Sequence, residues 1–213
     1  MIQSSNERLF YFSVNSAKYF SILFALAIIP LSAILPASIS WENGPLEDFQ
    51  VLLLFSGCLI SLYFYKQAPH SRFRKMWLTT SGLFLLLTGR ELSWGRVFFQ
   101  TKLTTHGPEF LSMSHIPHHM IINILLGCLI LAVLAGIIFF VPWGKLFFDI
   151  PWPTSFIFLL FLGALLSTIG DHSWIFPSDQ GENMEELGEI LMYSLLLHLT
   201  LYYHYWLKKL DCN

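Results

Sequence analysis

The chain has 213 residues, of which 54% are hydrophobic and only 12% are charged; its net charge is −2 and its mean hydropathy is +0.58. A soluble domain carries about 25% charged residues, so this chain has too few polar groups to cover a water-exposed globular surface. The composition excludes a soluble enzyme, a disordered chain and a nucleic-acid-binding protein, which would need a basic surface.

Six apolar segments are each long enough to cross a membrane, which takes about 20 residues. They are residues 19–39, 46–65, 76–98, 120–141, 153–170 and 185–207. The connecting loops are short and leave no room for a separate soluble domain. We therefore predict an all-α fold, a polytopic membrane protein with six transmembrane helices in a single domain of residues 1–213.

The basic residues predict how the chain is oriented, because cytoplasmic loops carry an excess of Lys and Arg. With the N-terminus inside, nine of the twelve basic residues lie on the inner side: Arg8, Lys18, Lys66, Arg72, Arg74, Lys75, Lys145, Lys208 and Lys209. We therefore predict a multi-pass protein of the bacterial inner (plasma) membrane, with both termini in the cytoplasm.

The carboxylates and imidazoles are distributed the other way. Eleven of the fourteen Asp and Glu residues and five of the eight His residues fall on the outer side or in the outer half of a span. The positive-inside rule concerns Lys and Arg only and does not explain this clustering. We interpret it as a polar carboxylate and histidine pocket that opens to the periplasmic side.

Arg90 and Glu91 lie inside the third apolar segment, about 12 Å from its outer end at 1.5 Å per residue. Burying either charge unpaired costs at least about 2.5–3.5 kcal/mol. Neighbours on a helix point about 100° apart, so each charge is expected to find its partner on another helix. Trp94 shares a helical face with both. The pair either lines a polar cavity or forms a structural ion pair, and the sequence leaves both open.

Glu189 is the most informative of the acidic residues at the start of the sixth segment. Glu182, Glu185 and Glu186 suit a helix N-terminus, where acidic side chains are favourable. Glu189 lies a turn deeper, so we expect it to face the bundle, with Arg90 as its partner. We also expect Glu185 to line the predicted carboxylate and histidine pocket.

Glu47 and Asp48 begin the second segment. They fit an ordinary helix start, in which acidic residues occupy the first turn. The alternative is that one of them pairs with Arg90.

The histidines suggest a metal site, because neutral imidazole is the commonest metal ligand. The candidate ligands are His115, His118, His119, Asp171 and His172. A stripe of small residues at Gly163, Ser167 and Gly170 is expected to bring Asp171 to the bundle centre. The cofactor would be a divalent metal such as zinc. The alternatives are interfacial histidines at a helix start and an ordinary turn after the fifth segment.

Three segments together resemble an uncharacterised family of bacterial polytopic membrane proteins. They are Glu42-Asn-Gly-Pro-Leu-Glu47, Arg90-Glu-Leu-Ser-Trp-Gly95 and Glu185-Glu-Leu-Gly-Glu189. That family has an E-[DN]-G-x-x-E turn, an E-E-x-S-W-G-Q-R segment, a later H-N pair and an E-E-x-x-E helix start. Here Arg90 replaces the first Glu of the second motif, and Arg96-Val97 replaces its Gln-Arg. The resemblance implies the architecture and these positions, and it implies no activity.

Two classes of function remain, and the sequence leaves open whether the protein is an enzyme. The first is a metal-assisted lipid hydrolase or transferase at the outer leaflet, with Glu91 or Glu189 as general base near Arg90. The alternative is a small transporter or proton-coupled carrier, or a non-catalytic accessory subunit of a membrane complex. The expected partners are the lipid bilayer and either a lipid substrate or another membrane protein, and no nucleic acid.

Overall fold

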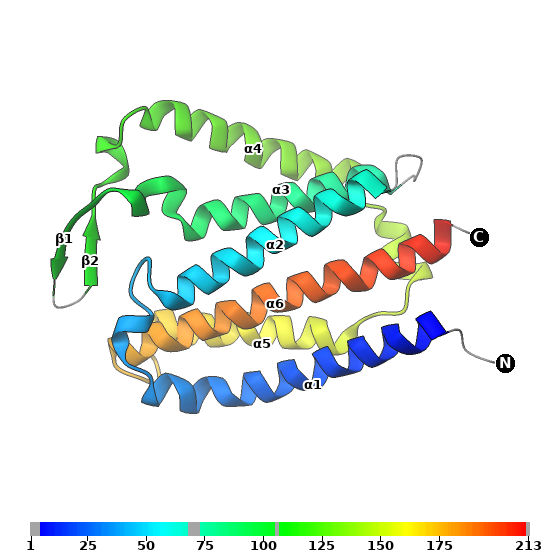
Figure 1. Cartoon of the computed structure of the whole chain (residues 1–213), viewed down its shortest axis with the longest axis horizontal. Helices are drawn as coiled ribbons and strands as arrows, with labels where there is room; N and C mark the ends of the chain where they lie inside the picture. Colours follow the sequence, from blue (N-terminus) through cyan, green and yellow to red (C-terminus); the bar gives the residue numbers. More distant parts are fainter. Residues whose placement is uncertain (1–4, 68–72, 105–106, 212–213) are drawn as a thin grey trace. The chain divides into compact units, whose positions relative to one another are not determined.

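The computed structural model describes residues 5–67, 73–104 and 107–211 (Figure 1). Arg72, which contributes to the predicted orientation, lies outside these residues. The described part is mostly helical, which confirms the all-α prediction. Its α-helices are α1 (Ser5–Ile34), α2 (Pro45–Gln67), α3 (Arg74–Glu91), α4 (His119–Phe140), α5 (Thr154–Asp171) and α6 (Ser178–Asp211).

Four of the described helices are long and apolar enough to cross a membrane. These stretches are Glu7–Ile34 in α1 and the whole of α2, α4 and α5. Helix α3 has only 18 residues and includes Arg74, Lys75, Arg90 and Glu91. Helix α6 is long but also contains Glu, His and Tyr residues. The fold supports a membrane protein, and six spans stay a prediction.

Helix α3 ends at Glu91, although its segment was predicted to continue to Phe98. The backbone leaves the helix because Trp94 and Gly95 have positive φ angles inside the following 3₁₀ segment, Ser93–Phe98. A two-stranded antiparallel hairpin follows, formed by β1 (Gln100–Thr104) and β2 (Gly107–Phe110). The sequence analysis did not predict this hairpin.

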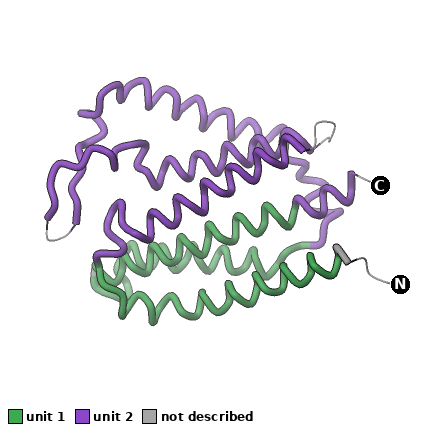
Figure 2. Tube along the Cα trace, viewed as in Figure 1, with its two compact units in different colours: residues 1–37, 152–203 green, residues 38–151, 204–213 purple. Residues whose placement is uncertain are grey.

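The chain divides into two compact units (Figure 2). Unit 1 comprises Met1–Ala37 and Trp152–Tyr203, and unit 2 comprises Ser38–Pro151 and His204–Asn213. The single domain of residues 1–213 stays a prediction.

In unit 2, α3 packs against both α2 and α4. Glycines allow the close approach: a Cβ at Gly57 of α2 would lie 2.5 Å from the Phe84 ring of α3. Likewise, a Cβ at Gly136 of α4 would lie 2.4 Å from the Thr79 hydroxyl of α3. Helix α3 is therefore the centre of this unit, and it directs its last turn toward the loop that precedes α2.

In unit 1, α5 and α6 pack backbone to backbone, as the small-residue stripe predicted. A Cβ at Gly170 would lie 2.5 Å from the Glu185 nitrogen, and one at Gly188 would lie 2.7 Å from the Ser167 nitrogen. Such contact leaves room only for hydrogen at these positions. The two helices are thereby fixed in register.

Candidate functional site

Two loops of unit 2 meet through the Glu42 carboxylate. Glu42 lies in the loop before α2, and its Oε1 accepts a hydrogen bond of 3.2 Å from the Ser93 hydroxyl. The same oxygen pairs with the Arg96 guanidinium. Both charged side chains are about one-third exposed. The first and second motifs of the sequence analysis are therefore joined in space.

The loop that carries Glu42 is itself held by Glu47. The Glu47 carboxylate accepts the Asn43 backbone N–H at 2.5 Å, and the Gly44 N–H donates to the Trp41 carbonyl at 2.7 Å. In this contact, which is similar to a capping box, a carboxylate in the first turn of the helix accepts the backbone N–H of the residue before the N-cap. Glu47 thus makes a contact typical of a helix start, and Asp48 is an exposed residue of the same turn. A pair of either residue with Arg90 stays a prediction.

The turn after α3 is strained. Ser93, Trp94 and Gly95 have φ angles of 43°, 53° and 92°. A non-glycine residue in this left-handed region costs on the order of 1–3 kcal/mol, and such residues gather at functional sites. The Trp94 ring lies over Gly89, where a Cβ would be only 2.5 Å from it. The strained conformation of the turn is therefore stabilised by the packing of Trp94 on Gly89 and by the contacts of Ser93 and Arg96 with Glu42.

Arg90 and Glu91 lie within ion-pair distance of each other, although adjacent helical side chains were expected to point apart; a partner for each on another helix stays a prediction. The Arg90 Nη1 lies 3.5 Å from the Glu91 Oε1. The Arg90 side chain is 54% exposed, whereas that of Glu91 is 5% exposed. Both residues lie in the last turn of α3. The Arg90–Glu91 pair therefore combines an accessible guanidinium with a buried carboxylate.

Glu189 is buried in unit 1, as expected for a residue that faces inward. The Tyr193 hydroxyl donates to its Oε2 at 3.2 Å. Glu185, one turn earlier, is partly buried. The predicted Arg90–Glu189 pair would join residues of different units and stays a prediction.

Asn183, near the start of α6, is a fully buried polar residue. Its amide donates to the carbonyls of Leu35 at 3.0 Å and Ser32 at 3.4 Å, at the end of α1. Those carbonyls belong to the last residues of a helix and the residue after it, which lack helical donors. Asn183 therefore attaches α6 to α1 within unit 1.

The predicted metal ligands are mostly at the surface. His115 and His118 are exposed, and the His115 Nδ1 lies 2.6 Å from the Ser112 hydroxyl. His118 precedes α4 with a φ of 62°, and His119 is the first residue of that helix. This arrangement corresponds to the alternative of histidines at a helix start.

Asp171 does not lie at the centre of its unit, contrary to the prediction. Its side chain is 62% exposed and lies 3.3 Å from the His172 Nδ1. The close α5–α6 packing buries Gly170 and directs the next residue outward. Asp171 and His172 bring two ligand groups together, and no third joins them among the residues that the structure describes.

No metal is assigned to these residues. Within residues 5–67, 73–104 and 107–211, no three His, Cys, Asp or Glu side chains come together as a metal site. No family model, curated protein or solved structure matches the chain. The site is therefore defined by its own geometry.

Ser93 and Arg96 are the residues of the site that sequence reasoning missed. Glu42 and Arg96 carry opposite charges and are predicted on the same side of the membrane. That combination could have indicated the ion pair that the structure shows. The strained turn that joins them had no comparable signature, because only Gly95 among its residues favours a positive φ.

Proposed function

We propose that the chain is a multi-pass protein of the bacterial inner membrane that binds a phosphate-bearing lipid headgroup at the end of α3. In the proposed orientation, with both termini in the cytoplasm, this end faces the periplasm. The observation that carries the proposal is the exposed Arg90 guanidinium beside the buried Glu91 carboxylate.

A guanidinium has five N–H donors and binds phosphate through two parallel hydrogen bonds. The Arg90 side chain is 54% exposed, and its Nη1 lies 3.5 Å from the Glu91 carboxylate, so one end of the guanidinium is positioned while the side chain stays accessible from solvent. Because Arg90 also offsets the charge of the buried carboxylate, the pair tolerates an anionic ligand at a membrane interface. Charged groups in such places mark sites of function by default.

The neighbouring turn would give this site its rigidity. Ser93 and Arg96 both contact Glu42, so the segment that follows Glu91 is attached to the loop before α2. A binding group gains affinity when its support is ordered before the ligand arrives.

The catalytic form of this proposal is a lipid hydrolase or transferase in which Glu91 is the general base. A buried carboxylate close to a bound phosphate could accept a proton from the attacking hydroxyl or water, a role that contributes about 10²–10⁴-fold to a rate. No step is assigned to a metal, because the described ligand groups of each unit do not form a metal site.

A non-catalytic accessory subunit is the second candidate. It is favoured by large apolar side chains at the hairpin, where Phe98 and Leu103 are exposed. Exposed apolar groups beside polar residues mark surfaces that bind proteins or membranes.

Lipid turnover by the full chain in nanodiscs of phosphatidylethanolamine and phosphatidylglycerol tests the catalytic form. Mass spectrometry of the lipids over time should show products with the wild type. We expect Glu91→Gln to reduce the rate by at least about 100-fold and Arg90→Gln by at least about tenfold. Lys102→Gln is the matched control, because this exposed cation of the hairpin pairs with Glu109; its rate should equal that of the wild type.

Counting tightly bound phospholipid in the same proteins tests the binding form. Arg90→Gln should lose one phospholipid per chain, and Lys102→Gln should lose none. Absence of both turnover and an Arg90-dependent lipid would refute the proposal and leave the accessory subunit.

A further inference from the structure

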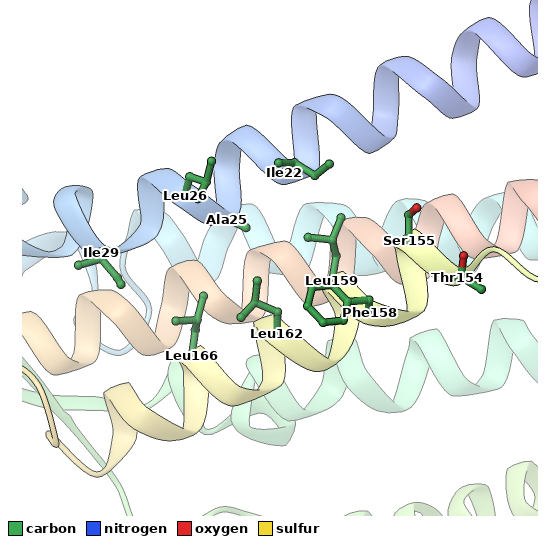
Figure 3. Close-up of a pocket in the computed structure, with 10 residues that line it drawn as sticks. All are labelled: Ile22, Ala25, Leu26, Ile29, Thr154, Ser155, Phe158, Leu159, Leu162 and Leu166. Atoms are coloured by element: carbon green, nitrogen blue, oxygen red, sulfur yellow. The ribbon is translucent and has the colours of Figure 1, made fainter.

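An apolar groove runs between α1 and α5 in unit 1, far along the chain from the Arg90 site (Figure 3). Its volume is about 730 Å³. Side chains of the two helices point into the same space, as the close-up shows, with Ile22, Leu26 and Ile29 on α1 and Phe158, Leu162 and Leu166 on α5. The groove lies entirely within one compact unit.

The groove has a closed floor and an open side. Ala25, Leu159 and Leu166 are buried, whereas Leu26 is 73% exposed and Phe158 is 68% exposed. Both helices are long and apolar enough to cross a membrane. In a bilayer, the open side of such a groove contacts hydrocarbon, so an acyl chain can enter it without crossing water.

A smaller cavity of about 230 Å³ continues the groove at the beginning of α5. The two share Thr154 and Ser155. The smaller cavity is lined by polar and aromatic groups, including Asn15, Lys18 and Trp152. Lys18 is the charged residue among the described residues that line the two cavities.

The order of these surfaces along α1 and α5 matches the order of parts in a phospholipid. The apolar groove corresponds to an acyl chain, the Thr154 and Ser155 hydroxyls to the ester region, and Lys18 to a negatively charged headgroup. The beginning of α5 adds the partial positive charge of a helix N-terminus at the same end. A transmembrane helix from another protein would match the apolar part alone.

We propose that unit 1 binds one phospholipid with an anionic headgroup, its acyl chain in the α1–α5 groove and its phosphate at Lys18. In the proposed orientation Lys18 faces the cytoplasmic leaflet, where basic residues near the surface attract anionic lipids. This site is separate from Arg90 and does not depend on the proposed function.

Native mass spectrometry of the full chain, released from detergent, tests the headgroup. The probes are dioleoyl phosphatidylglycerol and dioleoyl phosphatidylcholine, which share acyl chains and differ in charge. We expect Lys18→Ala to weaken phosphatidylglycerol binding about fivefold, since one basic residue at a surface contributes roughly that factor. Lys18→Arg should restore it, and phosphatidylcholine, whose choline offsets the charge of its phosphate, should lose less binding than phosphatidylglycerol.

Lys145→Ala is the matched control for the charge. Lys145 is an exposed lysine predicted on the same side of the membrane, and it pairs with Asp149. Phosphatidylglycerol binding to this variant should equal that of the wild type. Arg90→Gln should also keep the Lys18-dependent lipid, which separates this site from the one at α3.

A second pair of variants tests the groove. Leu26→Trp adds bulk at the exposed rim, so it should weaken phosphatidylglycerol binding about fivefold or more without a change in the core. Leu131→Trp is its control, at a residue of α4 that is 68% exposed; it should bind normally.

Three results would overturn the proposal. The first is equal binding of the two lipids by the wild type. The second is an equal loss in Lys18→Ala and Lys145→Ala. The third is full displacement of the lipid by millimolar glycerol 3-phosphate, which would assign Lys18 to a free phosphate and leave the groove without a role.

Discussion

Gly89 and Trp94 decide how the chain leaves α3. The indole lies against the helix where Gly89 has no side chain, and Ser93, Trp94 and Gly95 all have positive φ angles. This reversal places Ser93 and Arg96 at Glu42. At the scale of single residues, the absence of one Cβ therefore controls the shape of the candidate site.

Gly89→Ala should destabilise the protein by about 1–3 kcal/mol, because the new Cβ would lie 2.5 Å from the Trp94 ring and overpacking has that cost. Thermal unfolding in detergent measures the effect. Gly127→Ala is the control, since a Cβ there meets nothing within 4 Å. Equal melting temperatures for both variants would contradict the placement of Trp94.

The Glu42–Arg96 pair should show an interaction energy of about 0.5–1 kcal/mol in a double-mutant cycle of Glu42→Gln and Arg96→Gln. The pair is only partly exposed and Ser93 shares the carboxylate, so screening by water is incomplete. Denaturant unfolding in micelles gives the four free energies.

The exposed Lys145–Asp149 pair serves as a reference for this cycle. It lies four residues apart in one turn, for which about 0.3–0.5 kcal/mol is expected. A smaller interaction energy at Glu42–Arg96 than at this reference would show that the two loops are not joined.

At the scale of elements, the α5–α6 pair depends on backbone contact. Gly163, Gly170 and Gly188 lie where the helices touch, and their missing side chains let carbonyls and nitrogens approach directly. Small residues have this role in membrane helices because dispersion between closely packed backbones replaces the hydrophobic effect.

Gly170→Ala should therefore cost about 2 kcal/mol or more, since its Cβ would lie 2.5 Å from the Glu185 nitrogen and 2.6 Å from the Gly181 oxygen. The clash is with backbone, so no side chain can rotate away, and it outweighs the helix propensity gained, about 1 kcal/mol. Unfolding in detergent, with Gly127→Ala as reference, provides the measurement. A more stable Gly170→Ala protein would refute the close packing.

At the scale of the whole molecule, the number of membrane crossings determines which side each loop faces. If all six helices cross, the β1–β2 hairpin is outside and the turn at Lys145–Asp149 is inside. If only α1, α2, α4 and α5 cross, with the N-terminus inside, the two loops exchange sides.

Single cysteines at Lys102 and Lys145, in a chain whose Cys58, Cys128 and Cys212 are replaced by Ser, distinguish these topologies. Both lysines are exposed. We expect a membrane-impermeant maleimide to label position 102 and not 145 in intact spheroplasts, since basic residues favour the cytoplasmic side. Labelling of 145 alone would establish four spans, and permeabilised spheroplasts should label both.

The Glu42–Arg96 contact shows where sequence reasoning about the site stopped. The sequence identified the segments that contain Glu42, Glu91 and Glu189 as unusual, since charges in or beside apolar segments need a reason. It also predicted a partner for Arg90 on another helix, which stays a prediction, and it placed that residue further from the helix end than the structure does. The positive φ angles at Ser93 and Trp94 depend on two contacts. Glu42 is remote from Ser93 in the sequence, and the packing of Trp94 on Gly89 is not apparent from local propensity.

Composition and segment length predicted a helical chain for the membrane, because hydrocarbon admits only long apolar segments whose backbone bonds are internal. The stripe of small residues in α5 also predicted close packing of that helix, whereas its partner α6 and the close contacts of α3 were identified in the structure. The folded chain shows that α3 ends early, that a hairpin follows, and that Arg90 is accessible while Glu91 is buried. Those features depend on contacts between residues far apart in the chain, and no local pattern encodes them.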